Sequence, residues 1–541
     1  MRNWRVNLIF ILFILFSAVL ISRLIYIQIL QADFYKALAE GFLNRPKETQ
    51  ITRGEIFLKN GEPLAVNKNF TLVFATPSKV KNATQTSETL SKVLNLNQKF
   101  VLEALKKETL YSPIKHRLSQ EEIQALKDLN LPGIYLTEER GRYYPQETLA
   151  SQVIGFLGAE GIGQYGLEEY YDEVLREKGS DLILTLDYNI QFKAEKLLER
   201  AKENLEIEGG QIIVIDPNSG KLIALAHFPN FNPNQYQEYA TVDGLEIFKN
   251  KATRDFYEPG SVFKSITMAA GLNEGLIQPS TKYVDEGYVK IGGYTIYNYN
   301  NRVWGEETMT RVLENSINTG AVFVQKLLPN KTFLDYIEKF GIFEKTGIDL
   351  PESLSENKEF KKGREINFAT ASFGQGIEMT AIQLARAYSA IANGGRLVRP
   401  YLVEKILENG KISQNPASSL EEAGLGRQVI SQKTASQLVA MLVSVVENGS
   451  ARRAKIPGYY IAAKTGTAQV AFSALGIQKP GYSEKTVQTV VGFFPAFSPQ
   501  FLILVKLDNP QTRVAEYSAV PIFRDLAEYI IHQYQIPPDY E

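Results

Sequence analysis

The sequence predicts a multidomain α+β protein that an N-terminal helix anchors in a membrane. Three observations lead to this fold class: a long apolar run near the N-terminus, a length of 541 residues, and later stretches in which strand and helix patterns alternate. At about 100–200 residues per domain, this length predicts two to four domains rather than a single core. We therefore expect a membrane helix followed by two folded domains.

The apolar run covers residues 6–22, VNLIFILFILFSAVLIS, and resumes after Arg23 as far as Leu30. This length is sufficient to cross the hydrocarbon core of a bilayer. Arg2 and Arg5 precede the run, which favours a cytoplasmic N-terminus. We expect a tail at 1–5 and an uncleaved anchor at 6–30; a cleaved signal peptide is the alternative, although its apolar part is normally shorter.

Composition excludes several kinds of function. The 59 basic and 60 acidic residues nearly cancel, so the basic excess typical of a nucleic-acid-binding protein is missing. The absence of cysteine excludes disulfides and cysteine–zinc sites. The three histidines leave little material for a Ser-His-Asp triad, so we expect another base in any nucleophilic chemistry.

The remaining chain divides into two regions. Residues 31–180 alternate short strands with helices and predict a membrane-proximal α+β domain, and residues 181–535 predict one large domain before a short tail at 536–541. The individual expectations are a strand at 72–80, helices at 87–96 and 119–129 that each begin at a serine cap, a strand at 181–187, a helix at 189–205, and a strand–turn–strand unit at 209–229.

One of four Ser-x-x-Lys sequences has the context that nucleophilic chemistry requires. Pro259 and Gly260 break the chain before Ser261, and an apolar helical run follows, so Ser261 should begin a helix with Lys264 one turn on. A partly desolvated lysine can be neutral enough to take the proton of a serine hydroxyl. The alternative for any single copy is a serine cap followed by a solvated lysine. The copies at Ser78, Ser112 and Ser355 lack this context.

Two further motifs follow Ser261 in the chain. Ser316 and Asn318 interrupt an otherwise apolar helical pattern, either as site residues or as the cap of a helix junction. Residues 464–467, Lys-Thr-Gly-Thr, lie in a strand pattern, and a second strand at 487–496 suggests an antiparallel hairpin. Lys464, Thr465 and Thr467 could hold a substrate carboxylate, and Gly466 could leave room for the substrate backbone; the other Lys-Thr-Gly, at Lys345, is typical of a helix-ending turn.

The three motifs in this order are typical of penicillin-binding proteins and class A β-lactamases. The sequence resembles the class B penicillin-binding proteins, from the anchor to about residue 535. The resemblance rests on YEPGSVFK, SINTG and AAKTGTAQ, on the long helix after a glycine turn in 372–395, and on stretches at 222–234, 346–353 and 491–496. It implies a penicillin-binding/β-lactamase-like transpeptidase domain, with an antiparallel sheet flanked by helices.

The membrane-proximal part also resembles this family. Arg53, Gly54, Ile56 and Gly61 match the family pattern, as do Gly166 and Glu168 in the stretch 142–172, which indicates the family's elongated pedestal, or dimerisation-like, domain. Leu58 replaces the usual Asp and Lys59 the usual Arg, which weakens any salt bridge expected there. The ending at 516–539 resembles the division type more than the elongation type.

The resemblance implies roles for the motif residues. Ser261 would attack the carbonyl between two terminal D-alanines, with Lys264 as the base. Ser316 and Lys464 would relay the proton to the leaving amine, and Asn318 would hold the substrate amide. The backbone N–H groups of Ser261 and Thr467 would form the oxyanion hole.

The resemblance also implies partners and a location. The substrates would be peptidoglycan stem peptides on lipid-linked precursor glycan, β-lactam antibiotics would acylate the same serine, and neither metal nor organic cofactor is implied. The partners would be a membrane glycosyltransferase of the shape/elongation/division/sporulation family and divisome proteins. The chain would cross the bacterial cytoplasmic membrane once, with the N-terminus inside and the catalytic domain outside.

Three other functions use the same fold. A β-lactamase or β-lactam sensor shares the motifs, but such domains are much shorter, and no Glu is placed convincingly to activate water between Ser316 and Lys464. A D,D-carboxypeptidase differs only in using water as the acceptor, which the motifs alone do not decide. A non-catalytic divisome scaffold should lack a motif serine or lysine, and both are present.

Overall fold

The computed structural model describes residues 3–32, 35, 36, 39, 53–241, 244–414, 416 and 426–540. Met1 and Arg2 of the expected N-terminal tail, most of residues 33–52 at the start of the expected pedestal, and Glu541 of the expected C-terminal tail lie outside these residues. The chain divides into two compact units, one of residues 1–52 and 67–143 and the other of residues 53–66 and 144–541.

The first unit begins with an apolar helix. Helix α1 spans Asn3–Ile25 and continues as a π-helical turn over Tyr26–Leu30. The segment Asn7–Ile29 is long and apolar enough to cross a membrane, and none of it is buried within the protein. Among the described residues no other helix meets these criteria. The predicted span at 6–30 therefore corresponds to one continuous helical element.

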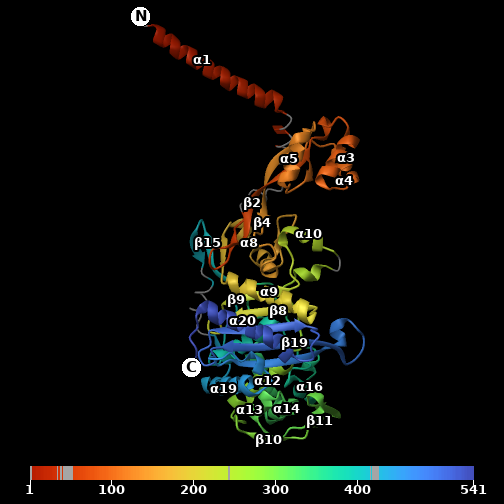
Figure 1. The fold of residues 1–541 in the computed structure, drawn as a ribbon, viewed down its shortest axis with the longest axis vertical. Helices are drawn as coiled ribbons and strands as arrows, with labels where there is room; N and C mark the ends of the chain where they lie inside the picture. Colours follow the sequence, from red (N-terminus) through yellow and green to blue (C-terminus); the bar gives the residue numbers. More distant parts are fainter. Residues whose placement is uncertain are drawn as a thin grey trace. The chain divides into compact units, whose positions relative to one another are not determined.

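The rest of the first unit is a small α+β domain (Figure 1). Strand β2 (Pro63–Ala75) pairs with β3 (Ser112–Lys115) and β4 (Ile134–Tyr143), and a core that includes Val73, Leu90 and Val101 packs against it. The helices are α3 (Ala83–Leu94), α4 (Gln98–Leu105) and α5 (Gln120–Leu129).

The helix caps in this domain test two predictions. Ser119 caps α5 and forms a capping box with Glu122, as predicted. The predicted start of the preceding helix at Ser87 is wrong, because α3 begins four residues earlier and Asn82 accepts the hydrogen bond from the Gln85 amide. An asparagine oxygen caps a helix as well as a serine hydroxyl does, so the earlier cap prevails.

The second unit contains a sheet in which all neighbouring strands are antiparallel. Five antiparallel strands follow the order β18–β19–β20–β8–β9. Figure 1 shows α9 and α20 on one side of this sheet, and α12 and α19 on the other. The strands are β8 (Gly209–Ile215), β9 (Leu222–Phe228), β18 (Ala462–Ala471), β19 (Tyr482–Phe494) and β20 (Phe501–Asp508). The predicted α+β architecture with an antiparallel sheet flanked by helices is confirmed.

The helices around the sheet form from strongly apolar segments. Helix α12 is buried almost throughout, and α17 is buried on all sides, so both serve as core helices. The helices are α9 (Tyr188–Leu205), α12 (Lys264–Asn273), α13 (Met309–Glu314), α14 (Asn318–Leu327), α15 (Asn330–Lys339), α16 (Glu365–Ala371), α17 (Ala381–Ala392), α19 (Gln432–Asn448) and α20 (Ala519–Tyr534).

Another sheet, to which β2 also belongs, joins distant parts of the sequence. Strand β7 (Asp181–Leu184) pairs in parallel with β1 (Ile56–Phe57) and antiparallel with β15 (Val403–Glu408), which also pairs with β16 (Lys411–Gln414). The strand predicted at 181–187 is thus shorter than expected and joins this sheet instead of the five-stranded one. Nearby are β5 (Phe156–Leu157), β6 (Gly163–Gln164), α6 (Ser151–Ile154), α7 (Gly166–Tyr170) and α8 (Asp172–Glu177).

Arg53 connects the segment before β1 to helices α7 and α8 through ion pairs. Its guanidinium forms ion pairs with Glu168 at 2.7 Å and Asp172 at 2.8 Å, and Arg53 and Glu168 are buried. Gly54 has no room for a side chain, because an added Cβ would lie 1.9 Å from the Ser180 carbonyl oxygen. The family-like residues Arg53, Gly54 and Glu168 therefore share one contact region, and the replacements at Leu58 and Lys59 leave its ion pairs intact.

Candidate active site

Ser261 lies at the start of the buried helix α12. Residues Gly260–Phe263 form a 3₁₀ turn, and α12 itself begins at Lys264, one residue after that turn. The prediction that Ser261 itself begins the α-helix is therefore slightly off, although the one-turn spacing to Lys264 holds. Gly260 has φ +61°, and its amide donates a hydrogen bond to the Gly374 carbonyl at 3.0 Å. This contact holds the turn against the loop after α16.

Lys264 is completely buried, and its side-chain nitrogen lies among oxygen atoms of the first two motifs. Nζ is 2.9 Å from Ser261 Oγ, 2.8 Å from Asn318 Oδ1, 2.5 Å from the Ser316 carbonyl oxygen and 3.2 Å from Ser316 Oγ. A neutral amine can donate two hydrogen bonds to these four oxygen atoms and accept one from the Ser261 hydroxyl. The contacts thus suit a lysine that acts as a base toward Ser261.

Ser316 lies between α13 and α14 and contacts a second lysine. Its backbone is left-handed, with φ +55°, and this conformation turns the short junction between the two helices. Nζ of Lys464, on β18, lies 2.9 Å from Ser316 Oγ. The sequence left open whether this motif was a helix junction or part of a site; the structure shows the junction and places its serine hydroxyl next to both lysines.

Burial lowers the pKa of both lysines. Lys464 is fully buried, which lowers its pKa to about 7. The pKa of Lys264 falls well below its usual value, first because of burial and then because of the nearby positive charge of Lys464. A buried lysine loses the hydration of its charged form, so the neutral amine becomes accessible near neutral pH.

Asn318 is held by a buried polar network. Its Nδ2 donates to the Tyr297 carbonyl at 3.1 Å, and its backbone amide donates to Asn298 Oδ1 at 3.1 Å. Asp285 in turn accepts from Asn298 Nδ2 at 2.8 Å and from the Thr319 hydroxyl at 2.6 Å. Sequence reasoning missed Asp285 and Asn298, because both lie in a loop-rich segment without a recognisable motif.

Strand β18 carries the third motif. Thr465 Oγ1 lies 3.2 Å from the hydroxyl of Ser450, a residue that sequence reasoning missed, and Thr467 Oγ1 accepts from the Ala515 amide at 3.2 Å. The predicted antiparallel pairing with the next strand is confirmed, with Lys464 opposite Val491.

Gly466 makes a close contact within the protein itself. A Cβ at Gly466 would lie 2.7 Å from the Pro259 carbonyl oxygen and 3.1 Å from Val262 Cγ1. The sequence suggested that the missing side chain leaves room for a substrate. The structure corrects this reason: the room is taken by the turn that carries Ser261, which can therefore pack directly on β18.

Glu258 is another acidic residue close to Ser261 that was not predicted. Its carboxylate accepts from the Gly376 amide at 3.0 Å and from the Tyr482 hydroxyl at 3.0 Å. Burial raises the pKa of Glu258 to about 7. The only sequence signal was its position three residues before Ser261.

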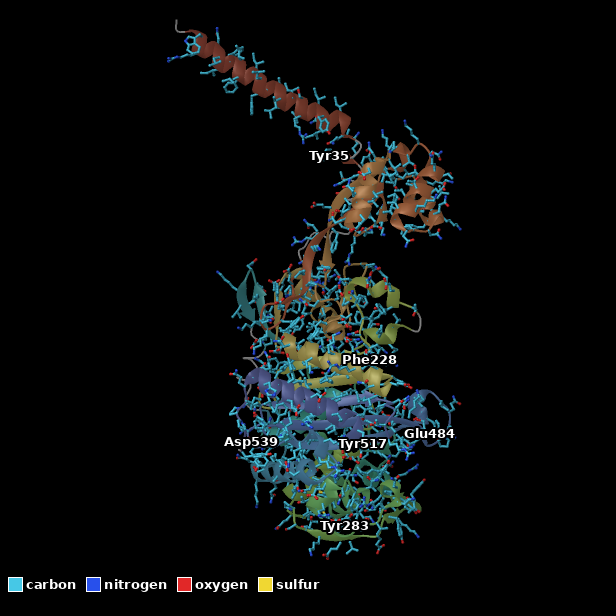
Figure 2. All side chains as sticks on the ribbon, in the orientation of Figure 1. Tyr35, Phe228, Tyr283, Glu484, Tyr517 and Asp539 are labelled. Atoms are coloured by element: carbon cyan, nitrogen blue, oxygen red, sulfur yellow. The ribbon has the colours of Figure 1, made fainter. Side chains whose placement is uncertain are left out.

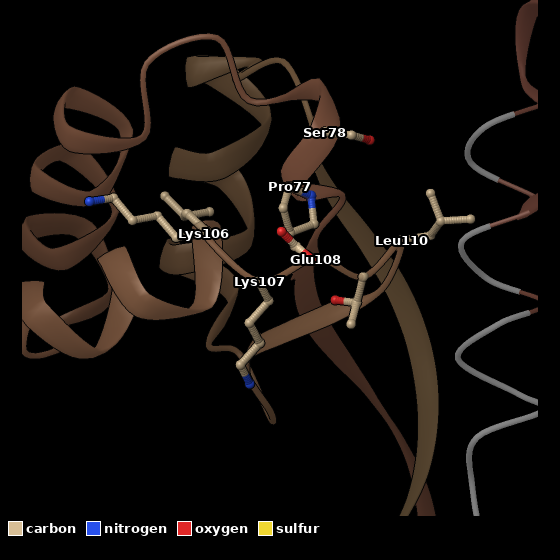
Figure 3. A pocket seen from close by; sticks show the side chains of 8 residues that line it. Pro77, Ser78, Lys106, Lys107, Glu108 and Leu110 are labelled. Atoms are coloured by element: carbon tan, nitrogen blue, oxygen red, sulfur yellow. The ribbon is translucent and has the colours of Figure 1, made fainter.

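The competing motif copies have other partners. Ser112 donates to the Ala104 carbonyl at 2.8 Å, Ser355 donates to Glu378 at 2.9 Å, and Thr346 of the other Lys-Thr-Gly donates to Glu352 at 2.7 Å. Ser78 lines an open cavity of the first unit, together with Pro77 and Leu105–Leu110 (Figure 3). Among the described contacts, none joins Ser78 to Lys81. Only the motif at Ser261 assembles with the other two.

Comparisons with known proteins agree with this fold. Residues 210–528 match the penicillin-binding protein transpeptidase domain, and residues 48–202 match the penicillin-binding protein dimerisation domain. The chain is 31% identical to stage V sporulation protein D of Bacillus subtilis, over 93% of this chain and 82% of that protein. It is 26% identical to peptidoglycan D,D-transpeptidase FtsI of Escherichia coli K12, over 99% and 93% of the respective chains.

Solved structures show the same relationship. Penicillin-binding protein 3 of Mycobacterium tuberculosis in complex with aztreonam superposes with a TM-score of 0.71 at 25% identity, over 90% of this chain and 97% of that one. The complex of the same protein with ampicillin gives the same TM-score and identity. The chain belongs to the class B penicillin-binding proteins. With its single N-terminal apolar helix, it is a single-pass membrane protein.

Proposed function

We propose that this protein is a peptidoglycan D,D-transpeptidase that cross-links stem peptides during septal cell wall synthesis, through an acyl-enzyme on Ser261. The observation that carries the proposal is the 2.9 Å contact between Ser261 Oγ and the buried Lys264 Nζ. A serine hydroxyl becomes a useful nucleophile only when a nearby base accepts its proton, and a buried lysine of lowered pKa is such a base.

The first half of the reaction forms the acyl-enzyme. Ser261 Oγ attacks the carbonyl carbon between the two terminal D-alanines while its proton passes to Lys264. The oxyanion accepts hydrogen bonds from the backbone amides of Ser261 and Thr467, and one such donor contributes about 3 kcal/mol to the transition state. The substrate carboxylate lies against Lys464, Thr465 and Thr467 on β18, and Asn318 holds the substrate amide.

Collapse of the tetrahedral intermediate breaks the peptide C–N bond. The leaving amine takes a proton through Ser316, whose hydroxyl contacts both lysines at 2.9 and 3.2 Å. An amine of a neighbouring stem peptide then attacks the ester carbonyl, loses a proton, and releases Ser261 with its hydroxyl restored. β-Lactams acylate the same serine. A D,D-carboxypeptidase, a β-lactam sensor or a scaffold is not favoured by the relatives, several of which are named D,D-transpeptidases.

The proposal extends to topology and partners. The N-terminus lies in the cytoplasm because Arg2 and Arg5 precede the anchor, which places the catalytic domain outside the cytoplasmic membrane. We assign residues 31–180 to the pedestal and 181–535 to the transpeptidase domain. A membrane glycosyltransferase of the shape/elongation/division/sporulation family and divisome proteins are the proposed partners, engaged through anchor and pedestal.

The test is covalent labelling of the purified full-length protein with a fluorescent penicillin. We expect stable labelling of the wild type and of Ser355→Ala, and none of Ser261→Ala. Ser355→Ala is the matched control, because Ser355 also begins a Ser-x-x-Lys sequence but donates to Glu378. Labelling of Ser261→Ala at the wild-type rate would contradict the assignment of the nucleophile. Cross-linking of lipid-linked precursor in the presence of the partner glycosyltransferase then distinguishes transfer from hydrolysis.

A further inference from the structure

A small hairpin next to the candidate active site exposes tyrosines on one face. Strands β11 (Tyr288–Ile291) and β12 (Tyr294–Tyr297) pair so that Tyr288 lies opposite Tyr297 and Lys290 opposite Thr295. The rings of Tyr288 and Tyr297 lie 6.3 Å apart, and these side chains are 43% and 53% exposed. We call the side formed by Tyr288, Lys290, Thr295 and Tyr297 the tyrosine face.

The opposite side of the hairpin accounts for its folding. Ile291 and Ile296 are buried and belong to a small core with Ala321 and Val322 of α14. Because side chains alternate along a strand, the tyrosine face points away from this core. Its aromatic residues therefore do not serve the packing of the hairpin, and exposed apolar surface gathered in one place is typical of a binding site.

The tyrosine face is continuous with the catalytic residues. The Tyr297 carbonyl accepts the hydrogen bond from Asn318 Nδ2, and Asn318 Oδ1 lies 2.8 Å from Lys264 Nζ. A stem peptide of about five residues spans at most ~17 Å when extended. A peptide whose end is bound at Ser261 can therefore have its sugar-bearing end at this hairpin.

The chemistry of the tyrosine face suits a glycan strand. The faces of pyranose rings present C–H groups that pack on aromatic rings, while the tyrosine hydroxyls can reach the sugar oxygens. Lys290 Nζ lies 5.9 Å from the centre of the Tyr288 ring, and Arg302 stacks on Trp304 at 3.7 Å. Positive charges beside aromatic rings complement carboxylates of stem peptides attached to the sugars.

A cavity next to the tyrosine face offers a place for a substituent. It has a volume of about 170 Å³, and Tyr288 and Val289 line it together with Tyr283, Thr319 and Phe323. Figure 2 places Tyr283, a residue of β10 (Lys282–Asp285), in the part of the second unit where Figure 1 places β10 and β11. The lining of the cavity also includes the charged residues Asp285, Glu286 and Lys326. The apolar side chains can pack on the methyl of an acetamido group on a sugar ring, and the hydroxyl and charged groups can hydrogen-bond its amide.

We propose that the tyrosine face of β11–β12 and the adjoining cavity bind the glycan of the peptidoglycan strand whose stem peptide is presented to Ser261. This inference rests on the proposed transpeptidase function and extends recognition from the peptide to the N-acetylated sugars. The aromatic rings hold the sugars, and the cavity receives an acetamido group. Binding of the polymer would thereby direct the stem peptide toward the catalytic serine.

The test uses glycan strands from which the stem peptides have been removed enzymatically. Their affinity for the full-length protein in detergent is measured by thermophoresis with wild type, Tyr288→Ser, Tyr297→Ser and the control Tyr170→Ser. Tyr170 is similarly exposed and lies on α7, away from β11 and β12 in sequence. We expect at least about a tenfold loss of affinity in either hairpin variant and wild-type affinity in the control.

Two results would overturn the inference: absence of binding of peptide-free glycan to the wild type, or wild-type affinity in both hairpin variants. If the hairpin variants bind glycan normally but fail to support division in cells, the tyrosine face contacts a protein instead. Fluorescent penicillin is added to the same wild-type sample as a separate readout. Failure of that labelling would count against the proposed function, whereas normal labelling without glycan binding would count only against this inference.

Discussion

Nζ of Lys464 lies 2.9 Å from Oγ of Ser316, although the two residues are 148 positions apart in the chain. This contact brings the strand β18 to the junction between α13 and α14. Because Lys264 contacts the same hydroxyl at 3.2 Å, Ser316 lies between two buried lysines. One hydroxyl can thus exchange protons with both, and the positive charge of Lys464 contributes to the lowered pKa of Lys264.

Replacement of Lys464 by Met should shift the pH profile of penicillin acylation. In the wild type, the rate constant should rise with pH as Lys264 loses its proton, because only the neutral amine is a base. Burial and then the charge of Lys464 lower the pKa of Lys264. Without that charge the pKa rises, so the acidic limb of the profile should move to higher pH. Stopped-flow measurements of acylation between pH 5 and 10, with each rate normalised to its plateau, give the midpoint of this acidic limb for both proteins. The same midpoint in the wild type and the variant would show that the charge of Lys464 does not influence Lys264.

Replacement of Lys264 by Met should abolish acylation while preserving the fold. Loss of a general base typically lowers a rate by about 10²–10⁴-fold. A methionine of similar length fills the same space but leaves Asn318 Oδ1 and the Ser316 carbonyl without the hydrogen bonds from Lys264, so the thermal midpoint should fall by a few degrees, roughly 2–6 °C. Labelling kinetics and calorimetry check both effects, and a strongly lowered midpoint would indicate that Lys264 is mainly a structural residue.

Gly374→Ala should impair both stability and acylation. Gly374 has φ +79°, and an added Cβ would lie 2.1 Å from the Gly260 carbonyl oxygen, so the turn that carries Ser261 must move. Gly363 is the matched control: it has φ +68° but open space around it, and its Ala variant should lose only about 1 kcal/mol. We expect at least about tenfold slower acylation in Gly374→Ala alone. Equal effects in both variants would contradict the steric explanation.

Asp285→Ala should slow acylation without a direct contact to the nucleophile. The buried carboxylate accepts hydrogen bonds from Asn298, Thr319 and the Trp304 amide, at 2.6–3.0 Å. Its loss leaves these donors unpaired and should destabilise the protein by about 2–4 kcal/mol. Asn298 holds the Asn318 backbone, and Asn318 is the residue proposed to hold the substrate amide. The affinity of the initial complex with penicillin should therefore fall more than the maximal acylation rate. Unchanged acylation with a lowered melting temperature would limit Asp285 to folding.

Glu258→Gln should change the pH dependence of stability. Burial raises the pKa of Glu258 to about 7 from 4.5, so between these values the folded state binds more protons than the unfolded state. Stability from this group is therefore complete below about pH 4.5 and is lost as the pH rises toward 7. Relative to wild type, the Gln variant should gain stability between pH 5 and 8. If the melting temperatures of the wild type and the variant differ by the same amount at every pH in this range, the raised pKa of Glu258 is contradicted.

Local sequence patterns were sufficient to predict several features of the fold. The Pro259–Gly260 break followed by an apolar run indicated the helix that begins next to Ser261, since the Ser-x-x-Lys spacing is one helical turn. Two strand-like segments separated by a loop indicated the hairpin of β18 and β19. The capping box at Ser119 and Glu122 was readable because all of its atoms lie within one turn of helix.

Other features could not be predicted from local sequence patterns, and most of these depend on contacts between distant parts of the chain. The helix start at Asn82 was missed, because asparagine and serine are both suitable caps and the sequence pattern did not distinguish Asn82 from Ser87. Gly466 was assigned to the substrate, whereas the Pro259 carbonyl occupies the space next to it. Asp285, Asn298 and Ser450 gave no signal, because their importance comes from partners elsewhere in the chain.

The sequence by itself therefore determined the class of protein, the membrane helix and the order of three motifs, because each depends on residues that are close together in the chain. The tertiary structure decided which Ser-x-x-Lys meets the other motifs, and that Lys264 and Lys464 are buried side by side around Ser316. Burial and the proximity of charges arise only when distant segments pack together. The lowered pKa values that make the lysines reactive are thus a property of the folded chain.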